Sequence, residues 1–315
     1  ELARTLYLLA NKQVVEPGNR RGEDSGEGGV APSVRRYSGP HCRRQAVEIL
    51  EGLIREDPKI PDYRFLLALC YRPGGGPDSV TSPASRQGWE RAIGILEELR
   101  TQYPEVTEFR YELTATYAWV NVGLFPWQQP SGGLSDAEAS LLKALAESEW
   151  LVTHNPSVPH YARSKALILA KLGAVCWRTD RPAKAEDCFA RALETQTGVI
   201  AEFPEAPAHD RVVLEFLRLR LAEVRYERAG DGKDASAAEP SCDLLDTSIE
   251  NLTGLIAQPE LKQDRLASTS LVAAYDILAR VLDEGGQKDQ AEETKRRAEG
   301  MRAMEASGRA NPWGL

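Results

Sequence analysis

The sequence predicts an all-α fold, a solenoid of about six helix hairpins that stack one on the next. Three observations predict it: helical periodicity, a proline joint that recurs along the chain, and an alanine at a fixed distance before that joint. The periodicity is clearest over residues 166–193, where apolar residues follow helical spacing on two segments separated by residues 179–182. We therefore expect an antiparallel helix pair, with Gly173 and Ala185 at its closest approach and Phe189 beside them.

The proline joint marks the end of one hairpin and the start of the next. A similar short sequence around a proline recurs about every 50 residues, at Pro58, Pro104, Pro156, Pro204 and Pro259. At the same distance before the first four of these prolines, an alanine stands on an apolar helical face: Ala46, Ala92, Ala144 and Ala192. A single globular core has no reason to restart at such intervals, whereas stacked hairpins must, because each buries its apolar face only against its neighbours.

The order of small and large residues in the hairpin resembles the tetratricopeptide repeat family. Leu172-Gly173 on the first helix, then Ala185, Phe189 and Ala192 on the second, carry this resemblance. The joints Tyr103-Pro104 and Phe203-Pro204, which end long second helices, resemble those of the tetratricopeptide arrays attached to planctomycete-type bacterial serine/threonine protein kinases. The resemblance implies a right-handed superhelix with a concave groove lined by the first helices. The alternative is an ordinary helix hairpin in a globular bundle.

The predicted hairpins differ in length because most hairpin loops carry inserts. The solenoid is expected over residues 1–306, with a C-terminal tail at 307–315 and a flexible insert at 13–40 that is rich in glycine and poor in apolar residues. In the third unit, Ser135 and Glu138 form a predicted capping box that fixes the start of the second helix. The expected units are residues 1–57, 58–103, 104–155, 156–203, 204–258 and 259–306.

Composition and charge disfavour several classes of function. The net charge of −8 disfavours a general role in binding phosphate backbones, and basic pairs such as Arg218 with Arg220 are interpreted as solvated faces. No run of about 18 apolar residues predicts a membrane-spanning helix. The five cysteines are odd in number and irregularly spaced, which is typical of reduced thiols in a cytoplasmic protein. Because Glu1 falls within a helical pattern, we expect a piece of a longer polypeptide.

Motifs for catalysis, metal binding and cofactor binding are not found in the sequence. The histidines do not stand at metal-ligand spacing with Cys, Asp or Glu, and the glycine run at 74–76 lacks the context of a phosphate loop. Carboxylate pairs such as Glu97-Glu98 lie near basic residues on expected exposed helix faces, where pairing along the helix explains them. The sequence therefore predicts no catalytic residue, no metal and no cofactor, and a protein that is not an enzyme.

The expected partner is a protein or peptide in the concave groove, without nucleic acid, membrane or metal. The best-known tetratricopeptide groove clamps a terminal carboxylate with Lys and Asn side chains. The corresponding positions here are Ala170 and Ala174, with Lys171 beside them, and Ala118 and Val122 in the preceding unit. We therefore expect a more apolar groove.

A row of aromatic residues is the candidate partner-binding surface. Phe125, Trp177 and Tyr226 take the same place near the end of three successive first helices, and Trp119 and Trp127 lie close to the first of them. Equivalent positions in a solenoid stack into a row, so these rings form a predicted stripe along one edge of the groove. The alternative is that each ring packs locally against its own hairpin loop.

These features favour a non-catalytic protein-interaction scaffold, the accessory or C-terminal region of a bacterial signalling protein such as a serine/threonine kinase. The alternative is the peptide-binding sensor region of a tetratricopeptide-containing transcription regulator. The flanking coding sequence distinguishes the two, because kinase motifs support the first and a helix-turn-helix supports the second.

Overall fold

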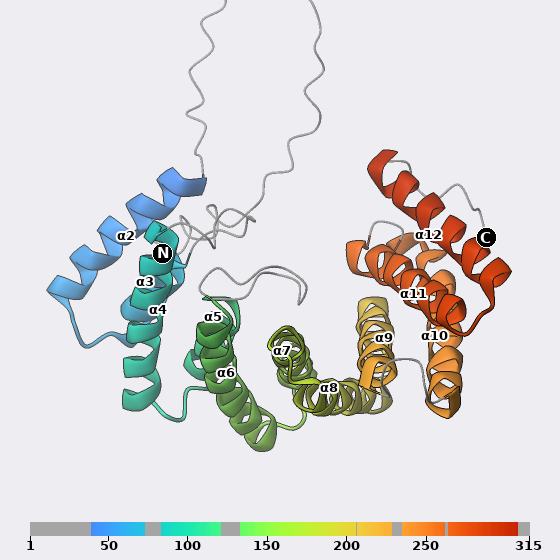
Figure 1. The fold of residues 1–315 in the computed structure, drawn as a ribbon. Coiled ribbons are helices and arrows are strands. Elements are labelled where there is room, and N and C mark those ends of the chain that lie inside the picture. Colours follow the sequence, from blue (N-terminus) through green and yellow to red (C-terminus); the bar gives the residue numbers. More distant parts are fainter. Residues whose placement is uncertain are drawn as a thin grey trace, which may run out of the picture. The chain divides into compact units, whose positions relative to one another are not determined.

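The computed structural model describes residues 39–72, 83–120, 133–205, 207–228, 235–261 and 264–307. Within these residues all regular structure is helical, which confirms the predicted all-α class (Figure 1). The helices are α2 (Gly39–Glu56), α3 (Pro61–Tyr71), α4 (Pro83–Gln102), α5 (Thr107–Val120), α6 (Leu134–His154), α7 (Pro159–Arg178), α8 (Pro182–Glu202), α9 (Ala208–Arg228), α10 (Ala235–Ile256), the 3-10 helix η2 (Pro259–Leu261), α11 (Arg265–Glu284) and α12 (Lys288–Ser307).

Several predicted features lie outside the described residues. They are most of the insert at 13–40, of which Gly39 and Pro40 open α2, and the tail beyond Ser307. Two of the candidate partner-binding residues, Phe125 and Trp127, also lie outside.

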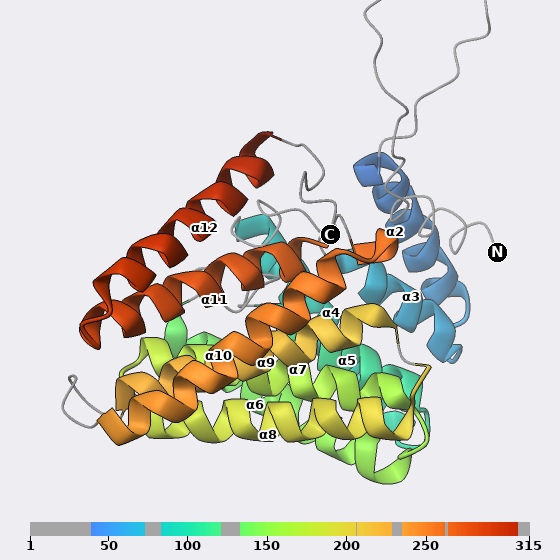
Figure 2. The same ribbon diagram turned by 90° about the vertical axis from the view of Figure 1, so that its right-hand side faces the viewer.

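The chain divides into two compact units, residues 1–123 and 124–315. In the first unit, α2 packs on α3, α3 on α4, and α4 on α5. In the second, each helix from α6 to α12 packs on the next, and α9 also packs on α11. Figures 1 and 2 show one such neighbouring pair, α11 and α12, side by side and joined by a short turn. Packing within each unit therefore follows the order of the helices along the chain.

The recurring alanines are core residues. They lie on α2, α4, α6 and α8, and each has 0% of its surface exposed: Ala46, Ala92, Ala144 and Ala192. A methyl side chain leaves room for close approach of a neighbouring helix. The regular spacing in the sequence therefore marks four buried core positions.

The proline joints end four helices in the same way. Proline has no N–H, and it disfavours helical backbone in the residue before it, so the residue before each proline donates the last helical hydrogen bond. These bonds run from Asp57 N to Leu53 O (2.8 Å), Tyr103 N to Leu99 O (2.8 Å), Asn155 N to Leu151 O (2.9 Å) and Phe203 N to Val199 O (3.0 Å). In each case a new helix begins within a few residues.

The predicted close approach between α7 and α8 is confirmed. A β-carbon on Gly173 would lie 3.0 Å from ring atoms of Phe189, which is tighter than nearly all β-carbon contacts in proteins, so the ring would have to move by a few tenths of an ångström. Ala185 is fully buried one turn earlier on α8. The absence of a side chain at Gly173 therefore makes room for the Phe189 ring.

The predicted capping box at the start of α6 is wrong. The helix begins at Leu134 with Gly133 as N-cap, and no side chain caps it. The Glu138 carboxylate instead accepts two hydrogen bonds of 2.7 Å from the Arg181 guanidinium, in the turn between α7 and α8. A bidentate pair with arginine is stronger than a hydrogen bond to a backbone amide at a helix start, which explains the different partner.

Other ion pairs also join helices of the second unit. Arg163 of α7 lies 2.7 Å from the carboxylate of Asp210 of α9, whose side chain is almost fully buried. Arg191 of α8 pairs with Glu149 of α6 at 3.0 Å. Arg225 of α9 pairs with Glu186 of α8 at 2.9 Å. The three ion pairs therefore join three different pairs of helices, and no residue is shared between them.

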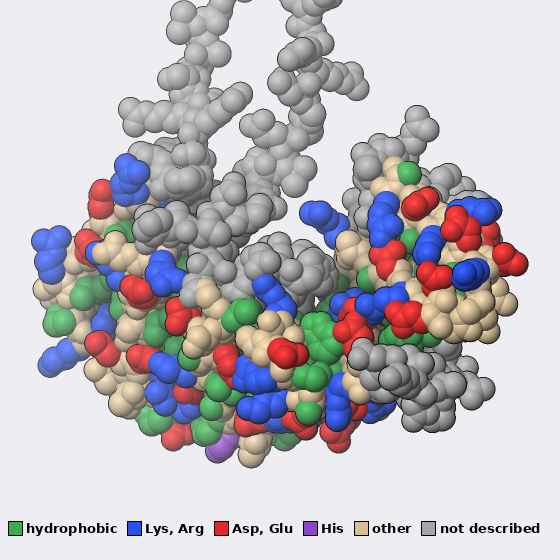
Figure 3. Space-filling model, viewed as in Figure 1, with side chains coloured by type: hydrophobic (Ala, Val, Ile, Leu, Met, Phe, Trp, Pro, Cys, Tyr) green, Lys and Arg blue, Asp and Glu red, His purple; other side chains and the backbone are tan. Residues whose placement is uncertain are grey.

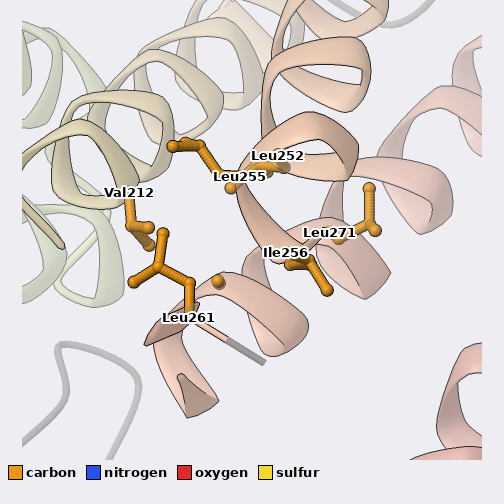
Figure 4. Packing of buried hydrophobic residues seen from close by; sticks show 7 residues of the cluster. Val212, Leu252, Leu255, Ile256, Leu261 and Leu271 are labelled. Carbon is orange, nitrogen blue, oxygen red and sulfur yellow. The ribbon is translucent and has the colours of Figure 1, made fainter. Parts of the chain in front are cut away.

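Apolar side chains from four elements meet in the core of the second unit. Figure 4 shows Val212 of α9 close to Leu261 of η2, with residues of α10 and α11 beside them. The cluster consists of Val212, Leu252, Leu255, Ile256, Leu261, Ala267 and Leu271. Among the described helices, none combines the length and apolarity that crossing a membrane requires.

Candidate functional site

A hollow with both apolar and polar lining residues lies where α9 meets α11 in the second unit. These two helices pack against each other although α10 separates them in the sequence. The hollow has a volume of about 330 Å³, at the lower end of the range for small-ligand and peptide side-chain sites. It is lined by Phe216 and Arg220 of α9, by Thr269, Ser270, Val272, Ala273 and Asp276 of α11, and by Arg302 of α12.

The Phe216 ring fixes the position of Arg220. Phe216 falls on the apolar face of α9 that also carries Val212 and Leu219, and it is only 4% exposed. Arg220 follows it by one helical turn, so the guanidinium carbon lies 5.7 Å from the centre of the ring, within the range of a cation–π contact. The arginine is therefore held at the hollow by its own helix.

A row of side chains with alternating positive and negative charge extends from the hollow along α9 and α11. Arg220 Nη1 lies 2.7 Å from one carboxylate oxygen of Glu223, and Arg280 of α11 lies 3.9 Å from the other. Arg280 also pairs with Glu227 at 3.0 Å. This row of charges ties the two helices together and uses part of the hydrogen-bonding capacity of Arg220.

The charges between α11 and α12 are also mixed. Arg302 pairs with Asp276, and Lys295 pairs with Asp283 at 3.4 Å. Figure 3 shows acidic and basic side chains interspersed over these two helices. The hollow therefore has no strong charge of one sign, and it favours a ligand through hydrogen bonds more than through net attraction.

Two buried polar atoms at the hollow have no hydrogen-bond partner in the described part of the chain. They are the hydroxyl oxygen of Ser270, a residue that is 3% exposed, and Nε of Arg220. A buried polar group without a partner costs roughly 1–3 kcal/mol, and most such groups in proteins are satisfied. A serine hydroxyl donates or accepts, whereas Nε–H of arginine only donates. A ligand group that accepts hydrogen bonds, such as a peptide carbonyl or a carboxylate, suits both.

The described candidate aromatics are not among the residues that line this hollow. Trp119 is half buried on α5 of the first unit, and Trp177 is half buried near the end of α7. Tyr226 of α9 packs against the apolar cluster around Leu219, and its hydroxyl donates a hydrogen bond to Glu284 of α11. The stripe of aromatics stays a prediction, since Phe125 and Trp127 lie outside the described residues.

The interpretation of Ala118 and Ala170 as groove-lining is wrong, and Lys171 beside Ala170 is buried as well. Ala118 of α5 and Ala170 of α7 are buried, and Lys171 has 0% of its surface exposed. α7 is covered because α6 and α8 both pack against it. Burial lowers the pKa of Lys171 to about 7, since charging the amine inside the protein loses its hydration. Ala174 is half buried, and Val122 lies outside the described residues.

The sequence contains only a weak signal for the hollow. Arg220 belongs to an alternation of leucine and arginine on α9, and the spacing from Phe216 to Arg220 to Glu223 places these three side chains along one face of a helix. That signal predicts a ring-backed arginine with an acidic neighbour. It does not indicate Ser270, whose role depends on the packing of α11.

The fold and the hollow define an all-helical protein with a ligand-sized cavity between packed helices. No protein-family model matches the chain, and no curated protein matches it in sequence. Among solved structures, it is similar to the crystal structure of BtubC (BKLC) from P. vanneervenii, at 16% sequence identity and a TM-score of 0.48, over 87% of this chain and 93% of that chain. A likeness of this degree carries no argument about function.

Proposed function

We propose that this chain is a tetratricopeptide-like, right-handed solenoid of about six hairpins that acts as a non-catalytic protein-interaction scaffold. In this proposal it is the accessory or C-terminal region of a bacterial signalling protein such as a serine/threonine kinase, and it works in the cytoplasm without metal or cofactor. The sequential packing of helices within each unit and the equal burial of the recurring alanines support the solenoid.

The hollow between α9 and α11 supports peptide binding. The observation that carries the proposal is that Ser270 and Arg220 each have a buried polar atom without a partner at one ligand-sized cavity. In this proposal, small movements of the Ser270 and Arg220 side chains expose these atoms to a carbonyl or carboxylate of a partner segment, and each buried hydrogen bond so formed is worth about 1 kcal/mol. The apolar atoms of Phe216 and Val272 then contact the rest of the inserted side chain.

The test is selection of peptide ligands followed by measurement of their affinity. A phage library of random peptides is selected on the immobilised chain, and the enriched peptides are synthesised with a fluorescent label. Their Kd values are measured by fluorescence anisotropy on the parent and on two variants. Thr269→Trp places a large side chain at the hollow, whereas Thr197→Trp is its matched control on the exposed face of α8. Both threonines make the same local hydrogen bond to a carbonyl of the preceding helical turn.

We expect Thr269→Trp to weaken binding by about tenfold or more and Thr197→Trp to leave it unchanged. Ser270→Ala is expected to weaken binding by a few fold, the loss of about one hydrogen bond. If no peptide is enriched over an unrelated helical protein, the scaffold proposal is wrong. Equal binding to both tryptophan variants instead places the binding surface elsewhere, with the aromatic residues as the next candidates.

A further inference from the structure

Another cavity lies between α10, α11 and α12 in the second unit. In the described part of the chain, α10 and α12 each pack on α11 but scarcely on each other. A space of about 490 Å³ is left there, and residues of all three helices line it. This volume is within the range of small-ligand sites, which often form between packed helices.

The floor of this cavity is part of the apolar core. Ile256 of α10 and Leu271 of α11 lie close together (Figure 4), and they are only 5% and 3% exposed. Tyr275 and Met301 also line the cavity, and they are half buried against the same cluster. A molecule that reaches this floor exchanges water for apolar contacts, so the floor favours a ligand with an apolar body.

Gly300 leaves the α12 side of the cavity open. It lies within α12 and is exposed, and a β-carbon at this position would meet nothing within 4 Å. Since Gly300 lines the cavity, a larger side chain there would occupy space that is now accessible to a ligand. The cavity can therefore be blocked by a substitution that meets no neighbouring atom at its β-carbon.

Two arginines of α12 lie at the mouth of the cavity. Arg296 and Arg297 both line it, and their side chains are 67% and 61% exposed. Arg296 Nε lies 3.9 Å from the carboxylate of Glu292. Arg297 Nε lies 3.2 Å from that of Glu293, which is the acidic residue among those that line the cavity. The mouth therefore carries more positive than negative charge.

The ion pairs of these arginines leave room for an anionic ligand. Both pairs join residues one helical turn apart on an exposed face, where ion pairs contribute little to stability. A guanidinium has five N–H donors, and each of these pairs is made through Nε. A bound carboxylate can therefore accept charge-assisted hydrogen bonds from the terminal nitrogens of both arginines.

We propose that this cavity binds a small amphipathic carboxylate, a molecule with an apolar chain and one anionic head group, such as a fatty acid. The chain lies on the apolar floor formed by Ile256, Leu271 and Met301. The carboxylate lies at the mouth and accepts hydrogen bonds from Arg296 and Arg297. A cation with the same chain gains the same apolar contacts but is repelled by the arginines, so the head group decides which ligand is preferred.

The first experiment compares two probes with similar chains and head groups of opposite charge. Sodium decanoate and decyltrimethylammonium bromide are each titrated into the full chain by isothermal titration calorimetry, below the concentrations at which they form micelles. We expect decanoate to bind at one site and at least about tenfold more tightly than the cation. Its affinity should exceed that of octanoate by about fourfold for each added methylene group. No binding of decanoate, or equal binding of the two probes, overturns the proposal.

The second experiment locates the site. Gly300→Phe places a large side chain at the cavity, and Gly254→Phe is its matched control on the exposed face of α10, where a β-carbon also meets nothing within 4 Å. We expect Gly300→Phe to weaken decanoate binding by about tenfold or more and Gly254→Phe to leave it unchanged. Thr269→Trp, which blocks the separate peptide hollow, should also leave it unchanged. Decanoate binding that is equal in Gly300→Phe and the parent contradicts the proposed location.

The third experiment tests the head-group contacts. A double variant with Arg296→Gln and Arg297→Gln should lose about tenfold in decanoate affinity and keep its affinity for the cation. The matched control combines Lys288→Gln and Lys295→Gln, which remove the same charge from α12 outside the cavity, and it should bind decanoate like the parent. An equal loss in both double variants refutes the assigned contacts. Should Gly300→Phe fail to fold by circular dichroism, this comparison decides the location of the site.

Discussion

At the scale of single residues, glycine is required at position 173 because the Phe189 ring occupies the space that a side chain there would need. Alanine in a helix interior is usually about 1 kcal/mol more stable than glycine, but a β-carbon on Gly173 would lie 3.0 Å from Phe189. We predict that Gly173→Ala destabilises the fold by about 1–2 kcal/mol, because the ring must move. The matched control is Gly198→Ala on α8, where a β-carbon meets nothing within 4 Å and a gain of about 0.5–1 kcal/mol is expected. Urea unfolding midpoints measure both, and a stabilised Gly173→Ala contradicts the packing.

The buried amine of Lys171 gives a prediction with a defined dependence on pH. Its pKa falls from the ordinary value of 10.5 to about 7 on folding, so between these pH values the unfolded chain binds more protons than the folded one. The stability of the parent should therefore rise with pH through this window. Lys171→Met keeps most of the volume and removes the titration, so it should be more stable by roughly 2–4 kcal/mol at pH 7. The difference should shrink toward pH 10, and a constant difference across urea titrations from pH 7 to 10 would rule out the buried amine as its cause.

At the scale of elements, the bond between Glu138 and Arg181 ties α6 to the turn of the α7–α8 hairpin. The Arg181 guanidinium holds the pKa of Glu138 below its usual value. A carboxyl group with a depressed folded pKa contributes stability above its unfolded pKa of about 4.3, and this contribution is lost as the pH falls through the folded pKa. Because both side chains are partly exposed, we predict that Glu138→Gln costs only about 0.5–1 kcal/mol at pH 7.

The control for this prediction is Glu194→Gln on the exposed surface of α8, where no change is expected. Thermal unfolding at pH 7 and pH 3 measures both variants. The cost of Glu138→Gln should fall at pH 3, since the parent carboxyl is then protonated to a larger extent. A cost that is unchanged at pH 3 would mean that the glutamine disturbs packing rather than charge.

The helices were predictable because their signals are local. Pro58, Pro104, Pro156 and Pro204 end helices through the chemistry of the proline itself, and the spacing of apolar residues defines which face is buried. The close contact between Gly173 of α7 and Phe189 of α8 was predictable for the same reason, because α7 and α8 follow one another directly in the sequence. Local signals also mislead, as at Ser135 and Glu138, where the pattern of a capping box was present but a distant arginine supplied a stronger partner.

The hollow and the buried lysine were not predictable, because they depend on helices that are distant in sequence. Arg220 and Ser270 meet only once α9 packs on α11, and from the sequence Arg220 belongs to a solvated basic pair. Lys171 is buried because α6 and α8 cover α7 from both sides.

At the scale of the whole molecule, the second unit is expected to fold without the first. Each helix from α6 to α12 buries its apolar face against helices of the same unit, and stability in such arrays is carried by contacts between neighbours. We predict that a fragment of residues 124–315 is helical and unfolds in one cooperative transition. Circular dichroism during urea titration measures both properties, and a broad transition with low helicity would show that the unit depends on the rest of the chain.

The ion pairs that join the helices of the second unit limit how this chain can change by duplication. Asp210 is nearly buried and pairs with Arg163 of α7. Glu149 pairs with Arg191 of α8, and Glu186 pairs with Arg225 of α9. A further copy of the α9–α10 hairpin, inserted after α10 by recombination within the gene, would carry a second Asp210 without an Arg163 in the hairpin before it, and would leave a buried charge alone at a cost of about 3–5 kcal/mol. A longer array therefore requires compensating substitutions on both sides of the insertion, so the number and order of hairpins in this unit are fixed by matched charges as much as by apolar packing.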